Sequence, residues 1–155
     1  MSDKRPPLKR RVLGVDPGGT TGLALIEFSP VRVIVAAELD PDAVSQWVHA
    51  LLCDTEADPV VAIAIERFTI SARTIKLSRQ NDALEVIGAV KAMVTITGGT
   101  VLTATQTPSD AKSTWPTERL KLHDLNVKGG HARDALRHAM LYLQRNYPSV
   151  VVAAH

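Results

Sequence analysis

Three short apolar segments open the chain, and only tight turns separate them. They cover residues 11–16 (RVLGVD), 22–28 (GLALIEF) and 31–38 (VRVIVAAE), with Pro17-Gly18-Gly19 and Ser29-Pro30 between them. Short runs rich in Val, Ile and Leu that end at Gly or Pro are typical of strands. Because strands joined by such short turns run in opposite directions, the sequence predicts a three-stranded antiparallel meander.

After residue 40 the apolar residues recur every three or four positions, which is typical of helices. A helix is expected to begin at Asp42 as its N-cap. A second is expected at residues 81–97, with an apolar stripe formed by Leu84, Ile87, Val90, Met93 and Val94. A third is expected from 130 to about 146, and the residues that face the core on it are Ala132, Ala135, Leu136, Ala139, Met140 and Leu143. Strands are expected at 60–65 and 101–105, one helical turn at 108–113, and irregular loops at 67–78 and 114–129. This order predicts an α/β fold: a mixed five-stranded sheet, the meander plus two parallel strands, with helices on both faces.

Length and composition are those of one ordinary globular domain. The chain has 155 residues, of which 45% are hydrophobic and 22% are charged. We expect a flexible basic arm at 1–10, a domain at 11–147 and a tail at 148–155. The single cysteine, Cys53, excludes an internal disulfide and a cysteine-rich zinc site. Without a signal sequence or an apolar run of roughly 18 residues, a cytoplasmic protein with no membrane partner is expected.

Charge is unevenly distributed along the chain although the net charge is only +2. Five basic residues and no acid lie in residues 4–11, and four basic residues and no acid lie in 67–79. By contrast, residues 38–58 contain six acids and no Lys or Arg. Such segregation is compatible with a polyanion bound to one face, and equally with a solvated arm and an acidic helix.

Two acids stand where apolar strands end: Asp16 follows RVLGV, and Glu66 follows VVAIAI. If these strands are parallel neighbours, their carboxyl ends lie together, where open α/β sheets bind ligands. Two carboxylates side by side repel each other and favour a divalent cation with oxygen ligands, such as Mg²⁺. Asp16 could also serve only as a turn former before Pro17.

The last predicted helix carries further candidates. His131 and Asp134 are three residues apart, so they share a face opposite the apolar stripe, and His138 lies roughly on that face. Asp134 could merely balance the helix dipole, and His131 could be a cap or a solvated side chain.

Four segments in this order resemble the RuvC Holliday junction resolvases of the ribonuclease-H-like superfamily, and the size suits a bacteriophage member. The segments are VLGVDPGGTTG, AIAIER, TPSDAKS and GGHARDALRHAMLYL, and the resemblance covers residues 11–146. It implies a homodimeric, metal-dependent endonuclease in a bacterial or phage-infected cell. Such an enzyme resolves branched DNA, leaves 5′-phosphate and 3′-hydroxyl ends, and acts in recombination and repair.

The resemblance also implies residue roles. Asp16 would bridge two Mg²⁺ ions, Glu66 and Asp134 would each hold one, and His131 would be a ligand or accept a proton from water. Mn²⁺ should substitute for Mg²⁺, and no small-molecule cofactor is implied. The resemblance implies DNA contacts for Phe68 and Lys112. From their positive charge, Arg67, Arg73, Lys76 and Arg79 are also expected to contact DNA, and the alternative is that they belong to a solvated loop.

Three alternative functions differ in the chemistry that they require. A fork or flap nuclease, or a ribonuclease, would keep the same carboxylates and change the substrate. A non-catalytic nucleic-acid-binding module would not need a full set of acids. An ATP-dependent phosphotransferase, suggested by the Gly-rich turn DPGGTTG, would need a second domain for which 155 residues leave no room.

Overall fold

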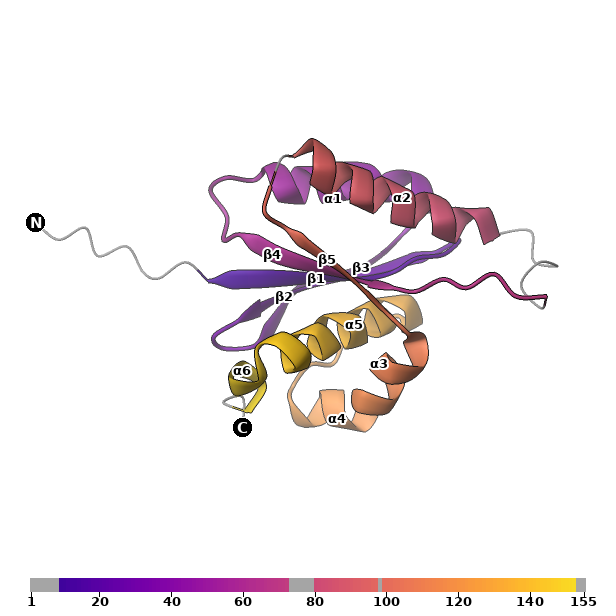
Figure 1. Ribbon diagram of the computed structural model, residues 1–155. Helices are drawn as coiled ribbons and strands as arrows, with labels where there is room; N and C mark the ends of the chain where they lie inside the picture. The colour runs from indigo at the N-terminus through magenta and orange to yellow at the C-terminus, as the bar shows by residue number, and fades with distance from the viewer. Residues whose placement is uncertain (1–8, 73–79, 98, 153–155) are drawn as a thin grey trace, which may run out of the picture.

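A single mixed sheet lies between two layers of helices (Figure 1). The computed structural model describes residues 9–72, 80–97 and 99–152. Three antiparallel strands are followed in the chain by two parallel ones: β1 (Arg10–Asp16), β2 (Thr21–Phe28), β3 (Arg32–Leu39), β4 (Val60–Glu66) and β5 (Leu102–Gln106). Their order across the sheet is β3-β2-β1-β4-β5, with β4 parallel to both β1 and β5. The predicted α/β sheet is confirmed.

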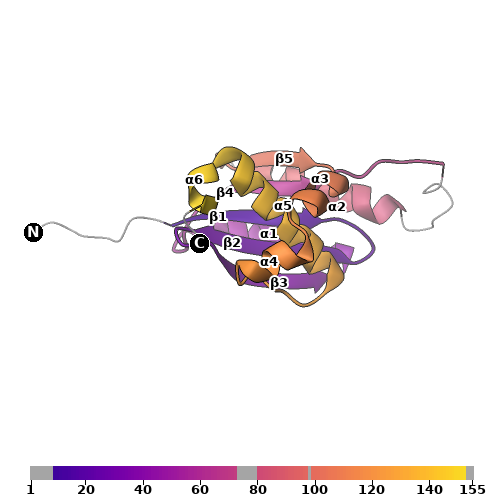
Figure 2. The ribbon, with the colours of Figure 1, turned by 90° about the horizontal axis from the view of Figure 1, so that it is seen from below.

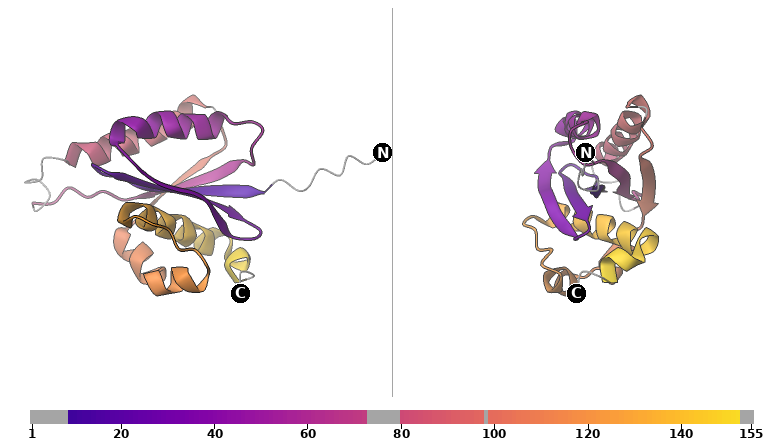
Figure 3. Two further views of the ribbon diagram at one scale, coloured as in Figure 1. Left: turned by 180° about the vertical axis from the view of Figure 1, so that it is seen from behind. Right: turned by 90° about the vertical axis from the view of Figure 1, so that its left-hand side faces the viewer.

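Helices cover both faces of this sheet. On one face lie α1 (Pro41–Cys53) and α2 (Gln80–Ile96), and on the other lies α5 (Gly130–Asn146) (Figures 1 and 3). Three short helices gather around α5 (Figure 2): α3 (Pro108–Thr114), α4 (Thr117–Leu122) and α6 (Pro148–Val152). No helix in the described ranges is both long and apolar enough to cross a membrane.

Alternation along β1 divides the interior into two clusters. Val12 belongs to the cluster under α5, whereas Leu13 and Val15 belong to the cluster under α1 and α2. Ala62 and Ala64 of β4 likewise face α5. Because successive side chains of a strand point to opposite faces, the even-numbered residues at the ends of β1 and β4 also face α5.

Glycines let α5 lie directly on the strands. A Cβ atom on Gly14 would lie 1.9 Å from the carbonyl oxygen of Ala135, and one on Gly22 would lie 2.0 Å from that of His131. Neither position has space for a side chain. The backbone of α5 therefore packs directly against the backbone of β1 and β2 at these two glycines.

The helices differ from expectation at three places. The N-cap of α1 is Asp40 rather than Asp42, because Pro41 occupies the first turn, where its fixed φ suits a helix. Residues 114–129 are not wholly irregular, since Thr117–Leu122 form α4. The predicted tail contains α6, whose Val151 is buried in the core.

The packed face of α2 also differs from the predicted stripe. Leu84 was expected on it but is 43% exposed, whereas Ala83, Val86 and Val90 are buried. These three follow the spacing of three and four that a packed helix row requires, and Leu84 is rotated about 100° from Ala83.

Candidate active site

The ends of three adjacent strands place three polar side chains on the α5 face. Val15 pairs with Ile65, so Asp16 and Glu66 occupy the next positions of neighbouring parallel strands. Glu66 in turn pairs with Gln106 at the end of β5. The expectation that Asp16 and Glu66 end parallel neighbours therefore agrees with the structure.

Asp16 is a buried carboxylate in a negative environment. It is only 7% exposed, and its Oδ2 lies 2.9 Å from Nδ1 of His131. Burial, with the negative charge of Glu66 second, raises the pKa of Asp16 to about 6, although His131 opposes the shift. Asp134 adds a smaller contribution that also raises this pKa. Ionised Asp16 thus interacts with two other carboxylates.

His131 is held in the first turn of α5 by an acid from β3. Oε1 of Glu38 accepts hydrogen bonds from the backbone N–H of His131 at 2.9 Å and of Ala132 at 3.2 Å. Gly129 has a φ of 89°, and a Cβ there would lie 2.3 Å from Oε1 of Glu38. Glu38 therefore caps α5 from a distant strand. Sequence reasoning placed Glu38 at the end of a strand and did not detect this role.

Asp134, the other α5 acid, is paired with two cations. Its Oδ2 lies 3.1 Å from Nζ of Lys112, and its Oδ1 pairs with Arg137. Arg137 also donates to the carbonyl oxygen of Trp115 and to Oγ1 of Thr117. Asp134 is therefore tied to α3 and to the start of α4.

His138 points at Glu66 instead of sharing the exposed face of Asp134. Its ring is 1% exposed, and its Nε2 lies 3.0 Å from Oε2 of Glu66. Its Nδ1 faces the side-chain amide of Gln106. His138 was expected roughly on the exposed face of Asp134, but α5 packs on β4 at this point, so the His138 ring lies against the ends of β4 and β5.

The structure describes three of the six residues that were expected to contact DNA. Arg67 is exposed and Phe68 is half-buried directly after β4, and the side chain of Lys112 is 54% exposed on α3. Arg73, Lys76 and Arg79 lie outside the described residues.

A metal site is not assembled by the side chains as they stand. Within the described ranges, no three His, Cys, Asp or Glu side chains are close enough to hold an ion. Asp16 pairs with His131, Glu66 with His138, and Asp134 with Lys112 and Arg137. The donor chemistry still fits a hard divalent cation, because carboxylate oxygens from two strands and α5 repel one another at one edge.

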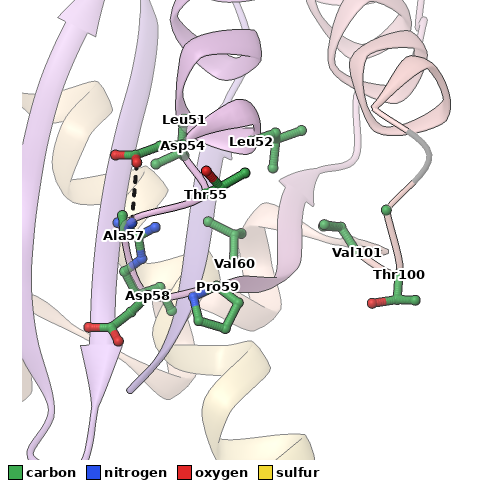
Figure 4. Close-up of a pocket in the computed structure, with 12 residues that line it drawn as sticks. Leu51, Leu52, Asp54, Thr55, Ala57, Asp58, Pro59, Val60, Thr100 and Val101 are labelled. Atoms are coloured by element: carbon green, nitrogen blue, oxygen red, sulfur yellow. Dashed lines mark hydrogen bonds between the residues drawn. The ribbon is translucent and has the colours of Figure 1, made fainter. Parts of the chain in front are cut away.

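Two hollows in the structure lie away from these carboxylates. One of about 390 Å³ is at the opposite end of the sheet, between the end of α1 and the start of β4 (Figure 4). Another of about 440 Å³ is acidic and lies between the β1–β2 turn and the starts of α1 and α2. Neither is lined by Asp16, Glu66 or Asp134. The candidate site is thus outside both hollows, whereas enclosed pockets are what small ligands usually occupy.

Comparison with known proteins identifies the fold. No protein-family model matches the sequence, and a search of curated proteins found no match. Among solved structures, RuvC of Thermus thermophilus in complex with a Holliday junction substrate is similar, with a TM-score of 0.68 and 16% identity over 88% of this chain and 95% of that one.

Two further structures are similar. For the fowlpox virus Holliday junction resolvase the TM-score is 0.54, with 10% identity over 87% of this chain and 99% of that one. For the yeast mitochondrial Holliday junction resolvase Ydc2 it is 0.52, with 11% identity over 97% and 87%. The chain therefore has the ribonuclease-H-like fold of RuvC and related Holliday junction resolvases, as the sequence resemblance predicted.

Proposed function

We propose that this protein is a metal-dependent endonuclease that cuts branched DNA, with the four-way Holliday junction as its substrate. One observation carries the proposal: Asp16 and Glu66 end neighbouring parallel strands on the face covered by α5, which adds His131 and Asp134. The similarity in fold to resolvases supports the same substrate class.

The three carboxylates would have different roles in holding the metal ions. Asp16, whose carboxylate interacts with the charges of both Glu66 and Asp134, would be a ligand shared by two Mg²⁺ ions, and Glu66 and Asp134 would be further ligands. Bound Mg²⁺ would supply an activated water and neutralise charge on the phosphate, and Mn²⁺ would substitute. His131, half-exposed beside Asp16, would be a further metal ligand or would accept the proton of the attacking water. The products would carry 5′-phosphate and 3′-hydroxyl ends.

Lys112 links substrate binding to the metal site. Its Nζ neutralises Asp134, but the side chain is 54% exposed and can reach a phosphate instead. When Lys112 moves to DNA, Oδ2 of Asp134 loses that partner and becomes available to a cation. Arg67 and Phe68, next to Glu66, would contact the DNA near the branch, and Arg73, Lys76 and Arg79 are proposed to bind phosphates. Affinity should therefore fall steeply with salt.

A homodimer would place two such sites against the two strands that must be cut. Exposed apolar side chains on α2, Leu84 at 43% and Ile96 at 67%, support a dimer contact along that helix. Light scattering should give twice the mass of one chain, and Leu84→Glu should reduce it to one. Leu122→Glu is the control, because Leu122 is 84% exposed on α4, on the other side of the sheet.

A cleavage assay with matched substrates tests the nuclease proposal. Wild-type protein is incubated with four-way junctions, flaps, single strands and RNA–DNA hybrids, in Mg²⁺ or in EDTA. Symmetric nicking of the four-way junction in Mg²⁺ is expected, with none in EDTA. Asp16→Asn keeps the shape and removes the charge, so it should bind junctions in a mobility-shift assay and not cut them.

Other outcomes favour the alternatives. Preferential cutting of flaps or hybrids would indicate a nuclease of the same fold with another substrate. Junction binding without metal-dependent cleavage would indicate a non-catalytic module. Cleavage by Asp16→Asn at near wild-type rate would exclude this site.

A further inference from the structure

A buried histidine lies directly behind Glu66, and packing alone does not account for it. His138 is 1% exposed on the inner side of α5, and its buried neighbours along the helix, such as Ala135 and Leu141, are apolar. Burying an imidazole requires partners for both ring nitrogens. Those partners are Glu66 at 3.0 Å and Gln106 at 3.1 Å.

The hydrogen bonds determine which ring nitrogen carries the proton. One end of the Gln106 side-chain amide faces Nδ1 of His138. The same end lies 3.0 Å from the backbone carbonyl oxygen of His138. A carbonyl oxygen can only accept, so this group must be the NH₂. The same NH₂ then donates to Nδ1 at 3.1 Å. Nδ1 is therefore an acceptor, and the ring proton is on Nε2.

This arrangement fixes the direction of the contact with Glu66. Nε2–H of His138 donates to Oε2 of Glu66. Gln106 is itself 5% exposed, so a buried amide orients a buried imidazole, which in turn orients a partly exposed carboxylate. Among the described residues, Oε1 of Glu66 has no hydrogen-bond partner, so this oxygen is the one available to a ligand.

We propose that His138 is a positioning residue for Glu66 and that Gln106 determines its tautomer. The inference rests on the proposed function, in which Glu66 holds a divalent ion. Without the Nε2–H donor, the Glu66 side chain would sample other rotamers, and ordering it on binding would weaken the affinity for the ion. Partners of this kind behind a metal ligand typically change metal affinity or activity by about 10–100-fold.

The test uses the full chain and two readouts that do not require cleavage. A long-range ¹H–¹⁵N spectrum of the metal-free wild type should show His138 protonated on Nε2 and unprotonated on Nδ1. Calorimetric titration with Mn²⁺ should show affinity reduced by about 10–100-fold in His138→Leu. His138→Gln, which places an amide donor near the position of Nε2, should recover most of that affinity.

Two more variants isolate the effect. Met140→Leu changes an equally buried residue of α5 without touching Glu66, so Mn²⁺ affinity should be unchanged. If His138→Leu does not fold, Gln106→Met keeps the histidine but removes the donor to Nδ1, and it should give mixed tautomers and weaker Mn²⁺ binding. Wild-type affinity in a folded His138→Leu or Gln106→Met variant, or a proton on Nδ1 in the wild type, would overturn the proposal.

Failure of the two proposals can be distinguished. If wild-type protein binds Mn²⁺ and the His138 variants weaken binding, but no DNA is cut, the role of His138 stands and the nuclease function falls. If the wild type cuts junctions and His138→Leu binds Mn²⁺ normally, the nuclease function stands and the role of His138 falls.

Discussion

The charge on Asp16 should destabilise the metal-free protein, and Asp16→Asn should therefore increase its stability. A carboxyl whose pKa rises on folding is costly to ionise in the folded state. The pKa of Asp16 rises from 3.8 to about 6, because of burial first and Glu66 second. At about 1.4 kcal/mol per pH unit, this corresponds to roughly 3 kcal/mol of unfolding free energy lost above pH 6.

The pH dependence follows from the sign of that shift. Below pH 3.8 the carboxyl is protonated in both states and costs nothing, and the cost grows until the pH passes about 6. In EDTA at pH 8, urea denaturation should show Asp16→Asn more stable by about 1–3 kcal/mol, with the difference vanishing near pH 4. Asp110→Asn, at an exposed carboxylate paired with Arg145, is the control and should change stability by less than about 0.5 kcal/mol.

Two results would refute this reasoning about Asp16. One is an Asp16→Asn variant no more stable than the wild type at pH 8. The other is a stability difference that stays constant down to pH 4, because a constant difference cannot come from ionisation of this group.

Three further predictions concern the stability of the fold, and each is checked by urea denaturation. Gly14→Ala places a Cβ 1.9 Å from a carbonyl oxygen of α5 and should reduce the free energy of unfolding by about 3 kcal/mol. The control is Gly88→Ala on α2, which has open space around it and should be neutral or stabilising by up to about 1 kcal/mol. Equal effects would contradict the close approach of α5. Glu27→Gln should reduce the free energy of unfolding by about 1 kcal/mol at neutral pH. Burial raises the pKa of Glu27, but hydrogen bonds from Arg32 and Lys9 lower it by more, so this loss of stability should shrink as the pH falls below 4.5. Glu38→Ala removes the cap of α5 and should cost about 1 kcal/mol, with faster amide exchange at His131; unchanged exchange there would argue against the cap.

Local patterns were sufficient to predict the sheet and the strand ends. Tight turns and short apolar runs, including the one at residues 60–65, indicate where the strands lie and where they end. Asp16 and Glu66 could therefore be assigned to the carboxyl ends of two neighbouring strands. The spacing of α5 likewise predicted its buried row, including Ala135 and Leu136. These features depend on periodicity within one element, which a single sequence contains.

Contacts between distant elements could not be predicted in the same way. Glu38 and Ala132 are 94 positions apart, and Glu66 and His138 are 72 apart. Nothing near Glu38 distinguishes a helix cap from an exposed acid at the end of a strand. The direction of His138 depended on where α5 crosses the sheet, which the helical period alone does not specify.

The close packing of α5 on Gly14 and Gly22 has a consequence for when the candidate active site can form during synthesis. His131 and Asp16 are 115 positions apart, so the first strand leaves the ribosome long before its partner is made. The α5 helix can settle onto Gly14 and Gly22 only after translation passes residue 146. A nascent chain that still lacks α5 therefore carries Asp16 without the histidine that pairs with it, and the nuclease that we propose stays inactive until α5 has been made.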